Sequence, residues 1–140
     1  MLMKIISLSV RGLGGTLKRK YLSDLVSKEW VDMVCLQETK CFEVSREKVC
    51  LLWGSNEVDW VVNKANNSVG GVLTIWNKKF FQMSNYVNGR NFTIIEGSWK
   101  VGSGVHVTIV NVYCSDSLWE RKEVWDEING FRLTQLSKAW

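Results

Sequence analysis

The chain has 140 residues, of which 46% are hydrophobic and 23% are charged, and its formal net charge is +4. This length and composition predict one folded domain of ordinary globular type and exclude a disordered or low-complexity chain. No apolar run is long enough to span a bilayer, and the start carries no secretory signal with a cleavage site. We therefore expect an intracellular protein, in the nucleus or cytoplasm, with no membrane partner.

The first third of the chain has the pattern strand, helix, strand, helix. Lys4–Val10 is predicted to be a strand, and a helix follows with Thr16 as its N-cap. The unbroken apolar run Met33–Leu36 predicts a strand buried on both faces. A crossover of this kind makes the two strands parallel. Ser45–Trp53 is predicted to be a short helix that ends before Gly54.

The pattern then changes to strands separated by short turns. Because the turns are short, these strands are expected to form antiparallel hairpins, with Asn88-Gly89 as a tight turn. Helical spacing predicts a last helix, and apolar faces that include Leu17 and Tyr21 in the first helix and Leu118 and Trp125 in the last. The predicted strands and last helix are Val58–Asn63, Gly71–Trp76, Phe80–Val87, Phe92–Trp99, Val105–Tyr113 and Leu118–Phe131.

Two candidate functional side chains lie at the ends of predicted strands. Glu38 follows the buried strand Met33–Leu36, and open α/β sheets place ligands at the carboxyl ends of their strands. Mg²⁺ needs only one or two carboxylates when substrate phosphates complete its coordination. Tyr113 ends its own strand and could direct its hydroxyl at a bound phosphate. The simpler alternatives are a solvated glutamate and a half-buried packing tyrosine.

Two other features are weaker signals. The glycine loop after the first strand lacks the dinucleotide-binding fingerprint, because Leu17 stands where the third glycine is required. A tight turn into a helix is the better interpretation, although a helix start can bind a phosphate. His106 is the only histidine and lies within a predicted strand, which favours a packing role.

Four sequence blocks stand in a recognisable order: M-K-I-I-S-L-S-V-R-G-L-G-G at Met3–Gly15, V-C-L-Q-E-T-K at Val34–Lys40, S-V-G-G-V-L-T-I-W at Ser68–Trp76 and N-V-Y at Asn111–Tyr113. Together they resemble the endonuclease/exonuclease/phosphatase superfamily, and most closely the endonuclease domain of plant LINE-type retrotransposons. The resemblance implies a mixed sheet with outer helices, as about half of a four-layer α/β sandwich. It makes residues 1–140 a single truncated domain of this type.

The resemblance implies Mg²⁺-dependent hydrolysis of a DNA phosphodiester by an activated water. By position, Glu38 would bind the metal and Tyr113 would be the catalytic residue that orients the phosphate. Arg11 and Lys40 border the same edge and are possible DNA contacts. Ser9 is a degenerate position, since the family has an asparagine there that contacts metal or phosphate.

The family's later G-D-F-N and S-D-H blocks, which supply an aspartate, an asparagine and the catalytic histidine, do not occur in this sequence. Members of one catalytic constellation fail together, so we expect this chain alone to be inactive and to bind Mg²⁺ weakly. Whether it is an enzyme stays open. The alternatives are a non-catalytic remnant that binds nucleic acid or protein, and a nucleotide-binding α/β module.

Packing gives one further expectation. In the family the first sheet packs against a second sheet that this chain is expected to lack. Its apolar face would then be uncovered, and such a patch marks an interface or an aggregation liability. The sequence therefore predicts self-association through this face. The residues expected on it include Val72, Ile75, Ile94, Val107 and Ile109.

Overall fold

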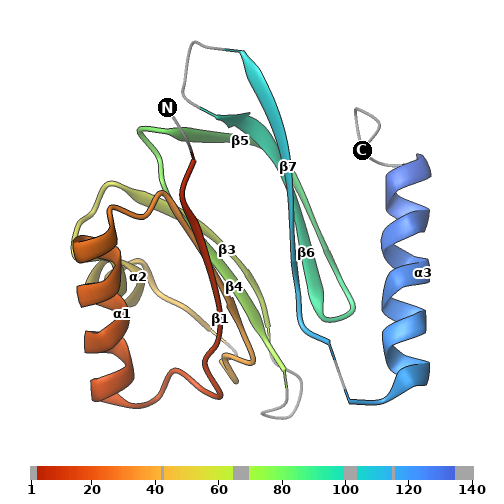
Figure 1. Ribbon diagram of the computed structural model, residues 1–140, viewed down its shortest axis with the longest axis horizontal. Helices are drawn as coiled ribbons and strands as arrows, with labels where there is room; N and C mark the ends of the chain where they lie inside the picture. Colours follow the sequence, from red (N-terminus) through yellow and green to blue (C-terminus); the bar gives the residue numbers. More distant parts are fainter. Residues whose placement is uncertain (1–2, 42, 65–69, 100–103, 115, 135–140) are drawn as a thin grey trace.

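The computed structural model describes residues 3–41, 43–64, 70–99, 104–114 and 116–134. Its strands form two sheets, which pack face to face (Figure 1). The first has the order β1-β2-β4-β3 and the second the order β5-β6-β7. The elements are β1 (Ile5–Ser9), α1 (Thr16–Glu29), β2 (Met33–Gln37), α2 (Arg46–Trp53), β3 (Val58–Asn63), β4 (Val72–Asn77), β5 (Phe81–Gly89), β6 (Phe92–Trp99), β7 (Val105–Val112) and α3 (Leu118–Thr134).

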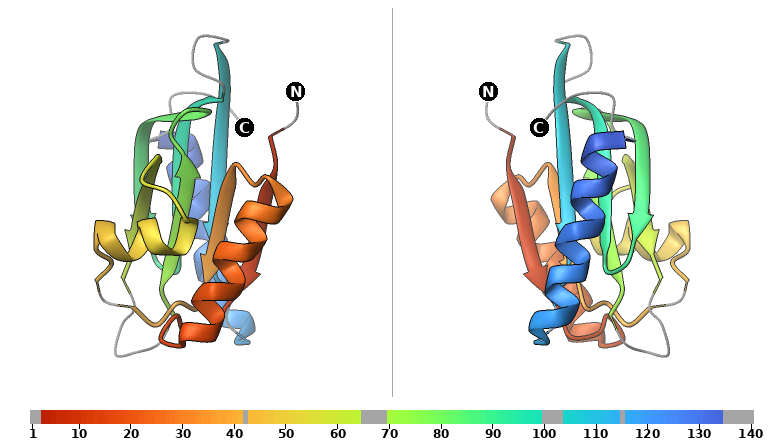
Figure 2. Two further views of the ribbon diagram at one scale, coloured as in Figure 1. Left: turned by 90° about the vertical axis from the view of Figure 1, so that its left-hand side faces the viewer. Right: turned by 90° about the vertical axis from the view of Figure 1, so that its right-hand side faces the viewer.

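The predicted strand directions are correct for the pairs that form, but β4 and β5, which were also expected to form a hairpin, lie in different sheets. β1 and β2 are parallel, as a strand–helix–strand crossover requires. All other pairs, β2 with β4, β3 with β4, β5 with β6 and β6 with β7, are antiparallel. α1 and α2 cover the outer face of the first sheet, and α3 covers the outer face of the second (Figure 2). The result is a four-layer α/β/β/α arrangement, which confirms the expected fold class.

The expectation of an uncovered sheet face is wrong. The hairpin strands β5, β6 and β7 form their own sheet, and its inner face covers the first sheet. Ile75 and Ile94 are also buried, but they face outward, Ile75 under α1 and α2 and Ile94 under α3. Val107 and Ile109 pack against the core between the sheets. The buried members of that core are Met33, Cys35, Val61, Trp76, Phe81, Ile95 and Trp99.

The predicted helix caps are correct for α2 but not for α1. Ser45 caps α2 by accepting a hydrogen bond from the amide of Lys48, and Gly54 ends it at φ 93°. The N-cap of α1 is Gly15 rather than Thr16, and no side chain caps it. None of the helices described is long and apolar enough to cross a membrane.

The predicted apolar faces of α1 and α3 are only partly buried. Leu22 and Val26 of α1, and Val124 and Ile128 of α3, are buried as expected. Four residues expected to pack inward are exposed instead, because each helix contacts its sheet along a stripe narrower than the apolar pattern. They are Leu17, Tyr21, Leu118 and Trp125.

The prediction of a tight turn at Asn88-Gly89 is also wrong. Both residues belong to β5, where they pair with Thr93 and Phe92, so the chain reverses two residues later. Gly89 is needed for close packing, because a Cβ there would lie 2.0 Å from the Phe92 ring. The positive φ of the reversal, 64°, is adopted by Asn91.

Candidate functional site

The carboxyl ends of β1, β2 and β7 lie at the same end of the sandwich, which we call the rim (Figure 1). Glu38 follows β2 of the first sheet, and Tyr113 follows β7 of the second. We expected the two residues at the end of one sheet. They come instead from two facing sheets, because β7 belongs to a separate sheet that packs over β2.

Backbone hydrogen bonds fix the segment around Glu38 to the loop after β1 and to the segment before β4. On one side, the amide of Gly12 donates to the carbonyl of Glu38 at 2.7 Å. On the other, the amide of Thr39 donates to the carbonyl of Gly71 at 3.1 Å. Glu38 and Lys40 have φ of 57° and 56° and flank the buried Thr39. Such left-handed conformations cost free energy in non-glycine residues, and they persist where surrounding contacts enforce them.

The loop after β1 is held by Lys18 of α1. Its ammonium group donates to the carbonyl oxygens of Val10, Arg11 and Gly12 at 2.9, 3.1 and 3.4 Å. The side chain of Lys40 lies beside Gly12, where a Cβ would be 3.6 Å from its Cδ. Arg11 and Lys40 therefore flank the backbone of Glu38, both exposed to solvent. Their contact with DNA stays a prediction.

Asn111 is the residue of this region whose importance the sequence did not reveal. It is 1% exposed, and its amide nitrogen donates to Thr74 Oγ1 at 2.9 Å and to the Leu73 carbonyl at 3.2 Å. Its Oδ1 accepts a hydrogen bond from Gln37 Nε2 at 2.8 Å. An asparagine between two valines of a predicted strand was the available signal, since a buried amide needs partners. Asn111 therefore joins β7 to β2 and β4 by hydrogen bonds, two positions before Tyr113.

The side chains at Glu38 can contribute to a metal site but do not complete one. Ser9 Oγ lies 3.3 Å from Glu38 Oε2. In the described part of the chain, no three His, Cys, Asp or Glu side chains are grouped closely enough to hold a metal ion. One carboxylate and a hydroxyl do not fit a resident Mg²⁺, which needs six oxygen ligands from protein, water or substrate.

Tyr113 lies in a negative environment. Burial and the nearby carboxylates of Glu38, Asp116 and Glu120 raise its pKa above the ordinary value of 10.0. Each cause disfavours the charged tyrosinate. At neutral pH the hydroxyl therefore keeps its proton and is a hydrogen-bond donor, which suits a phosphate oxygen. The effect of Glu38 on Tyr113 also shows that the two residues lie within electrostatic reach.

A polar cleft of about 400 Å³ lies next to these residues. It shares Gly71 with the backbone contacts of Thr39, and Glu120 with the surroundings of Tyr113. Its cations are Lys64 and Arg90, and the guanidinium of Arg90 is 2.6 Å from Glu123. Sequence analysis missed this cleft because its residues come from separate loops with no shared motif.

His106 is remote from the rim. It lies at the beginning of β7, whereas Tyr113 follows the end of that strand. Its Nε2 is 3.5 Å from a carboxylate oxygen of the buried Glu96. This position agrees with a packing role and excludes His106 as a base at Glu38 in this arrangement.

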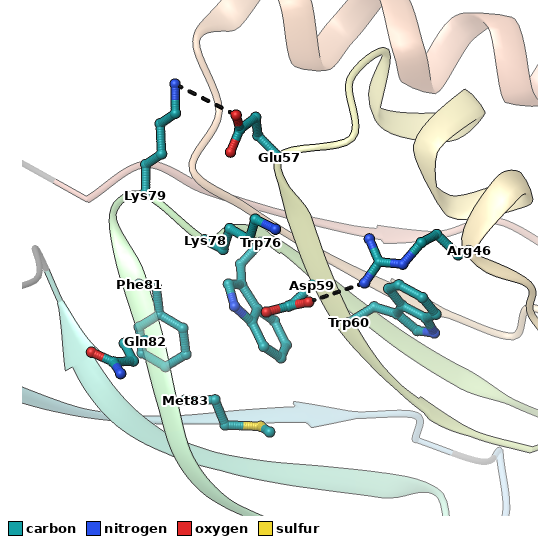
Figure 3. A pocket seen from close by; sticks show the side chains of 10 residues that line it. All are labelled: Arg46, Glu57, Asp59, Trp60, Trp76, Lys78, Lys79, Phe81, Gln82 and Met83. Carbon is teal, nitrogen blue, oxygen red and sulfur yellow. Dashed lines mark hydrogen bonds and ion pairs between the residues drawn. The ribbon is translucent and has the colours of Figure 1, made fainter.

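A cavity of about 860 Å³ is also separate from the rim (Figure 3). It lies at the opposite end of β4, since Trp76 lines it and pairs with the first residue of β2. Two of its cations are paired: Arg46 is 3.4 Å from Asp59, and Lys79 is 4.0 Å from Glu57.

No protein-family model matches the chain, and no curated protein is similar to it in sequence. Several solved structures share its fold at low sequence identity. TDP2 of D. rerio, solved with a single-strand DNA product, matches with a TM-score of 0.64 and 17% identity. The alignment covers 98% of this chain and 57% of that one.

Two further structures match in the same way. AP endonuclease LMAP of Leishmania major has a TM-score of 0.57 and 18% identity, with 92% of this chain and 44% of that chain covered. The catalytic domain of Xenopus laevis APE2 has a TM-score of 0.56 and 15% identity, with coverage of 94% and 51%. The chain thus has the fold of endonuclease/exonuclease/phosphatase proteins and spans about half the length of these structures.

Proposed function

We propose that the rim binds a phosphate of DNA in the manner of a Mg²⁺-dependent phosphodiesterase, and that this chain alone does not complete the hydrolysis. The observation that carries the proposal is the hydrogen bond between Gln37 and Asn111, which brings the ends of β2 and β7 to one rim beside a cleft that contains Lys64 and Arg90. Glu38 and Tyr113 follow these two strand ends. A carboxylate, a neutral hydroxyl donor and two cations are the groups needed to bind a phosphodiester and a shared metal ion.

Each residue has a defined part in this proposal. Glu38 supplies one carboxylate to a metal ion that the phosphate helps to bind. Tyr113 donates a hydrogen bond to a phosphate oxygen, and Arg11 and Lys40 contact neighbouring phosphates. Ser9 offers only a hydroxyl group, so it replaces poorly the amide expected from the family. Mg²⁺ supplies Lewis acidity when bound, but the residues present bind it weakly.

Hydrolysis needs a group that activates water, and the rim offers no good candidate among the described residues. The single histidine lies at the far end of β7. Loss of a general base costs on the order of 10²–10⁴-fold in rate. We therefore propose that hydrolysis requires residues of a longer protein of this fold.

A binding assay with matched variants tests the proposal. Fluorescence anisotropy should show that Mg²⁺ tightens the binding of a single-stranded oligonucleotide. Glu38→Gln should abolish the Mg²⁺ effect and should raise the metal-free affinity, because it removes a negative charge beside the phosphate. Tyr113→Phe should weaken binding in both conditions. The control Glu57→Gln, in the cavity at the opposite end of β4, should behave like the unaltered chain.

The main alternative is a non-catalytic remnant that binds nucleic acid or protein. It predicts salt-dependent affinity that neither Mg²⁺ nor Glu38→Gln changes. Mg²⁺-dependent cleavage of supercoiled plasmid, lost in Glu38→Gln, would show that the expected inactivity is wrong. A nucleotide-binding module predicts instead saturable binding of a mononucleotide with no preference for DNA.

We further propose an origin in the endonuclease domain of a plant LINE-type retrotransposon. The support is the order of the four sequence blocks, above all V-R-G-L-G and V-C-L-Q-E-T-K. A genomic sequence that continues in frame into G-D-F-N and S-D-H blocks would agree with this origin. A continuation into unrelated sequence would contradict it.

A further inference from the structure

The two helices that cover the first sheet leave a groove between them. α1 and α2 contact each other on the outer face of this sheet, where Figure 2 shows both helices. The groove has a volume of about 500 Å³. Because both of its walls are helices, it does not depend on a free strand edge. Its walls include Arg19, Lys20 and Ser23 of α1, and Glu47, Lys48 and Leu51 of α2.

Regular helical spacing builds both walls of the groove. Residues three or four positions apart share a face of a helix. Arg19 and Ser23 therefore lie on one stripe of α1, and Lys48 and Leu51 lie on one stripe of α2. The buried residues beside these stripes, which belong to the core on the first sheet, are Leu22, Val26, Val49 and Leu52.

Positive charge dominates the groove. Arg19, Lys20 and Lys48 line it, together with a single carboxylate, that of Glu47. Within the described ranges of the chain, none of these three cations forms an ion pair. Lys20 and Asp24 have the spacing of a helical ion pair but do not form one. The groove therefore presents a net positive charge that the chain itself leaves uncompensated.

Two of the cations are half-buried and are held by neutral groups. Arg19 Nη2 donates to Thr16 Oγ1 at 3.4 Å, and Lys48 Nζ donates to Cys41 Sγ at 3.6 Å. Removing a cation from water costs free energy unless an anion compensates it. A hydroxyl and a thiol compensate less than a carboxylate does. An anionic partner would supply what is missing, at two charges whose positions are already fixed.

The rest of the lining favours a peptide over a nucleic acid as that anionic partner. Leu51 is 71% exposed in the groove, and the phosphates through which DNA contacts a cationic surface do not cover an aliphatic side chain. None of the described lining residues is aromatic, so the groove lacks the surface on which the bases of single strands stack. A peptide can carry carboxylates and an aliphatic side chain close together.

We propose that the groove between α1 and α2 binds an acidic peptide segment of a protein partner. Carboxylates of the segment pair with Arg19, Lys20 and Lys48, and an aliphatic side chain packs on Leu51. Charge complementarity of this kind selects a partner by its sign. Glu47 repels a carboxylate placed beside it, and so limits the register in which the segment binds. The groove shares no residue with the rim, so this inference does not depend on the proposed function.

Fluorescence anisotropy with a labelled peptide of glutamate and leucine tests the proposal. This peptide should bind with an affinity that falls as salt is added, whereas a peptide with glutamine in place of glutamate should not bind. The double variant Lys20→Glu, Lys48→Glu should weaken binding at least tenfold. The matched control is Lys78→Glu, Lys122→Glu, which changes the net charge equally at two exposed lysines outside the groove and should keep the affinity. Failure of the acidic peptide to bind, or an equal loss in both double variants, would overturn the proposal.

Leu51→Gln gives a second readout that keeps every charge. Leucine and glutamine have similar helix propensities, so α2 should fold as before. The variant should weaken binding of the glutamate and leucine peptide at least threefold, and should not change binding of a peptide of glutamate and serine. If both peptides bound this variant as they bind the unaltered chain, the groove would sense charge alone and the proposal would be wrong. Displacement of the peptide by a single-stranded oligonucleotide, lost in Lys20→Glu, Lys48→Glu, would assign the groove to nucleic acid instead.

Discussion

Gln37 and Asn111 join the two sheets through a hydrogen bond of 2.8 Å from Nε2 to Oδ1. Gln37 is the last residue of β2, directly before Glu38, and Asn111 lies two positions before Tyr113. This one contact therefore aligns the two strand ends on which the candidate site depends. It also explains how residues from different sheets come to lie at one rim.

Replacing Asn111 should destabilise the whole fold. Asn111→Leu keeps the branched shape with a larger side chain and removes the hydrogen bonds to Gln37, Thr74 and the Leu73 carbonyl. Buried polar groups left unpaired cost about 1–3 kcal/mol each, so the free energy of unfolding should fall by about 2–4 kcal/mol. Urea denaturation measures this change.

The exposed Asn85 of β5 provides the control. Asn85→Ala should change the free energy of unfolding by no more than about 0.5 kcal/mol. A double-mutant cycle with Gln37→Leu should give a coupling energy of about 0.5–3 kcal/mol. Additive effects of the two changes would mean that the contact between the sheets contributes little.

Tyr113 should ionise above pH 10, and Glu38 should be part of the reason. Replacement by Glu38→Gln removes one negative charge and should lower the pKa of Tyr113. Absorbance of tyrosinate near 295 nm reports the titration, and subtraction of the Tyr113→Phe curve isolates this residue. An unchanged titration curve in Glu38→Gln would mean that Glu38 does not affect the pKa of Tyr113.

The same pKa predicts how stability changes in alkali. Because the folded state holds the proton of Tyr113 more tightly, its contribution is complete below pH 10, the unfolded pKa. It is lost as the pH rises from there through the higher folded pKa. Tyr113→Phe should therefore show a smaller loss of stability above pH 10 than the unaltered chain.

Local patterns predicted the strands and their directions well, because apolar runs and crossovers act over short distances. Met33–Leu36 and the antiparallel hairpins are examples. The division into two sheets was not predictable in this way. It depends on Asn111 of β7 facing Gln37 of β2, a contact across 74 positions of the chain. Glu38 and Tyr113 were found at strand ends, whereas Lys64 and Arg90 belong to loops that only the fold brings together.

Gly89 should not tolerate even a methyl group. In Gly89→Ala the new Cβ would lie 2.0 Å from the Phe92 ring, and Phe92 is fully buried against Phe131 of α3. Overpacking of this kind costs about 1–3 kcal/mol. Thermal unfolding should show a lower midpoint for this variant.

Gly130→Ala is the matched control for Gly89→Ala. Gly130 lies in α3, where a Cβ would meet no atom within 4 Å. An alanine in a helix is favoured over glycine by about 1 kcal/mol, so this variant should be slightly more stable. If Gly89→Ala were equally stabilising, Asn88-Gly89 would be a flexible turn, as the sequence alone suggested.

Lys64 and Arg90 should account for part of the salt dependence of DNA binding. Each cation that neutralises a phosphate of single-stranded DNA contributes about 0.7 to the slope of log K against log salt concentration. The double variant Lys64→Ala, Arg90→Ala should therefore reduce that slope by about 1.4. The control removes the same charges from the cavity at the opposite end of β4, with Arg46→Ala and Lys79→Ala. The two double variants have equal net charge, so an equal loss of slope would mean that DNA senses only total charge and that the rim is not its binding site.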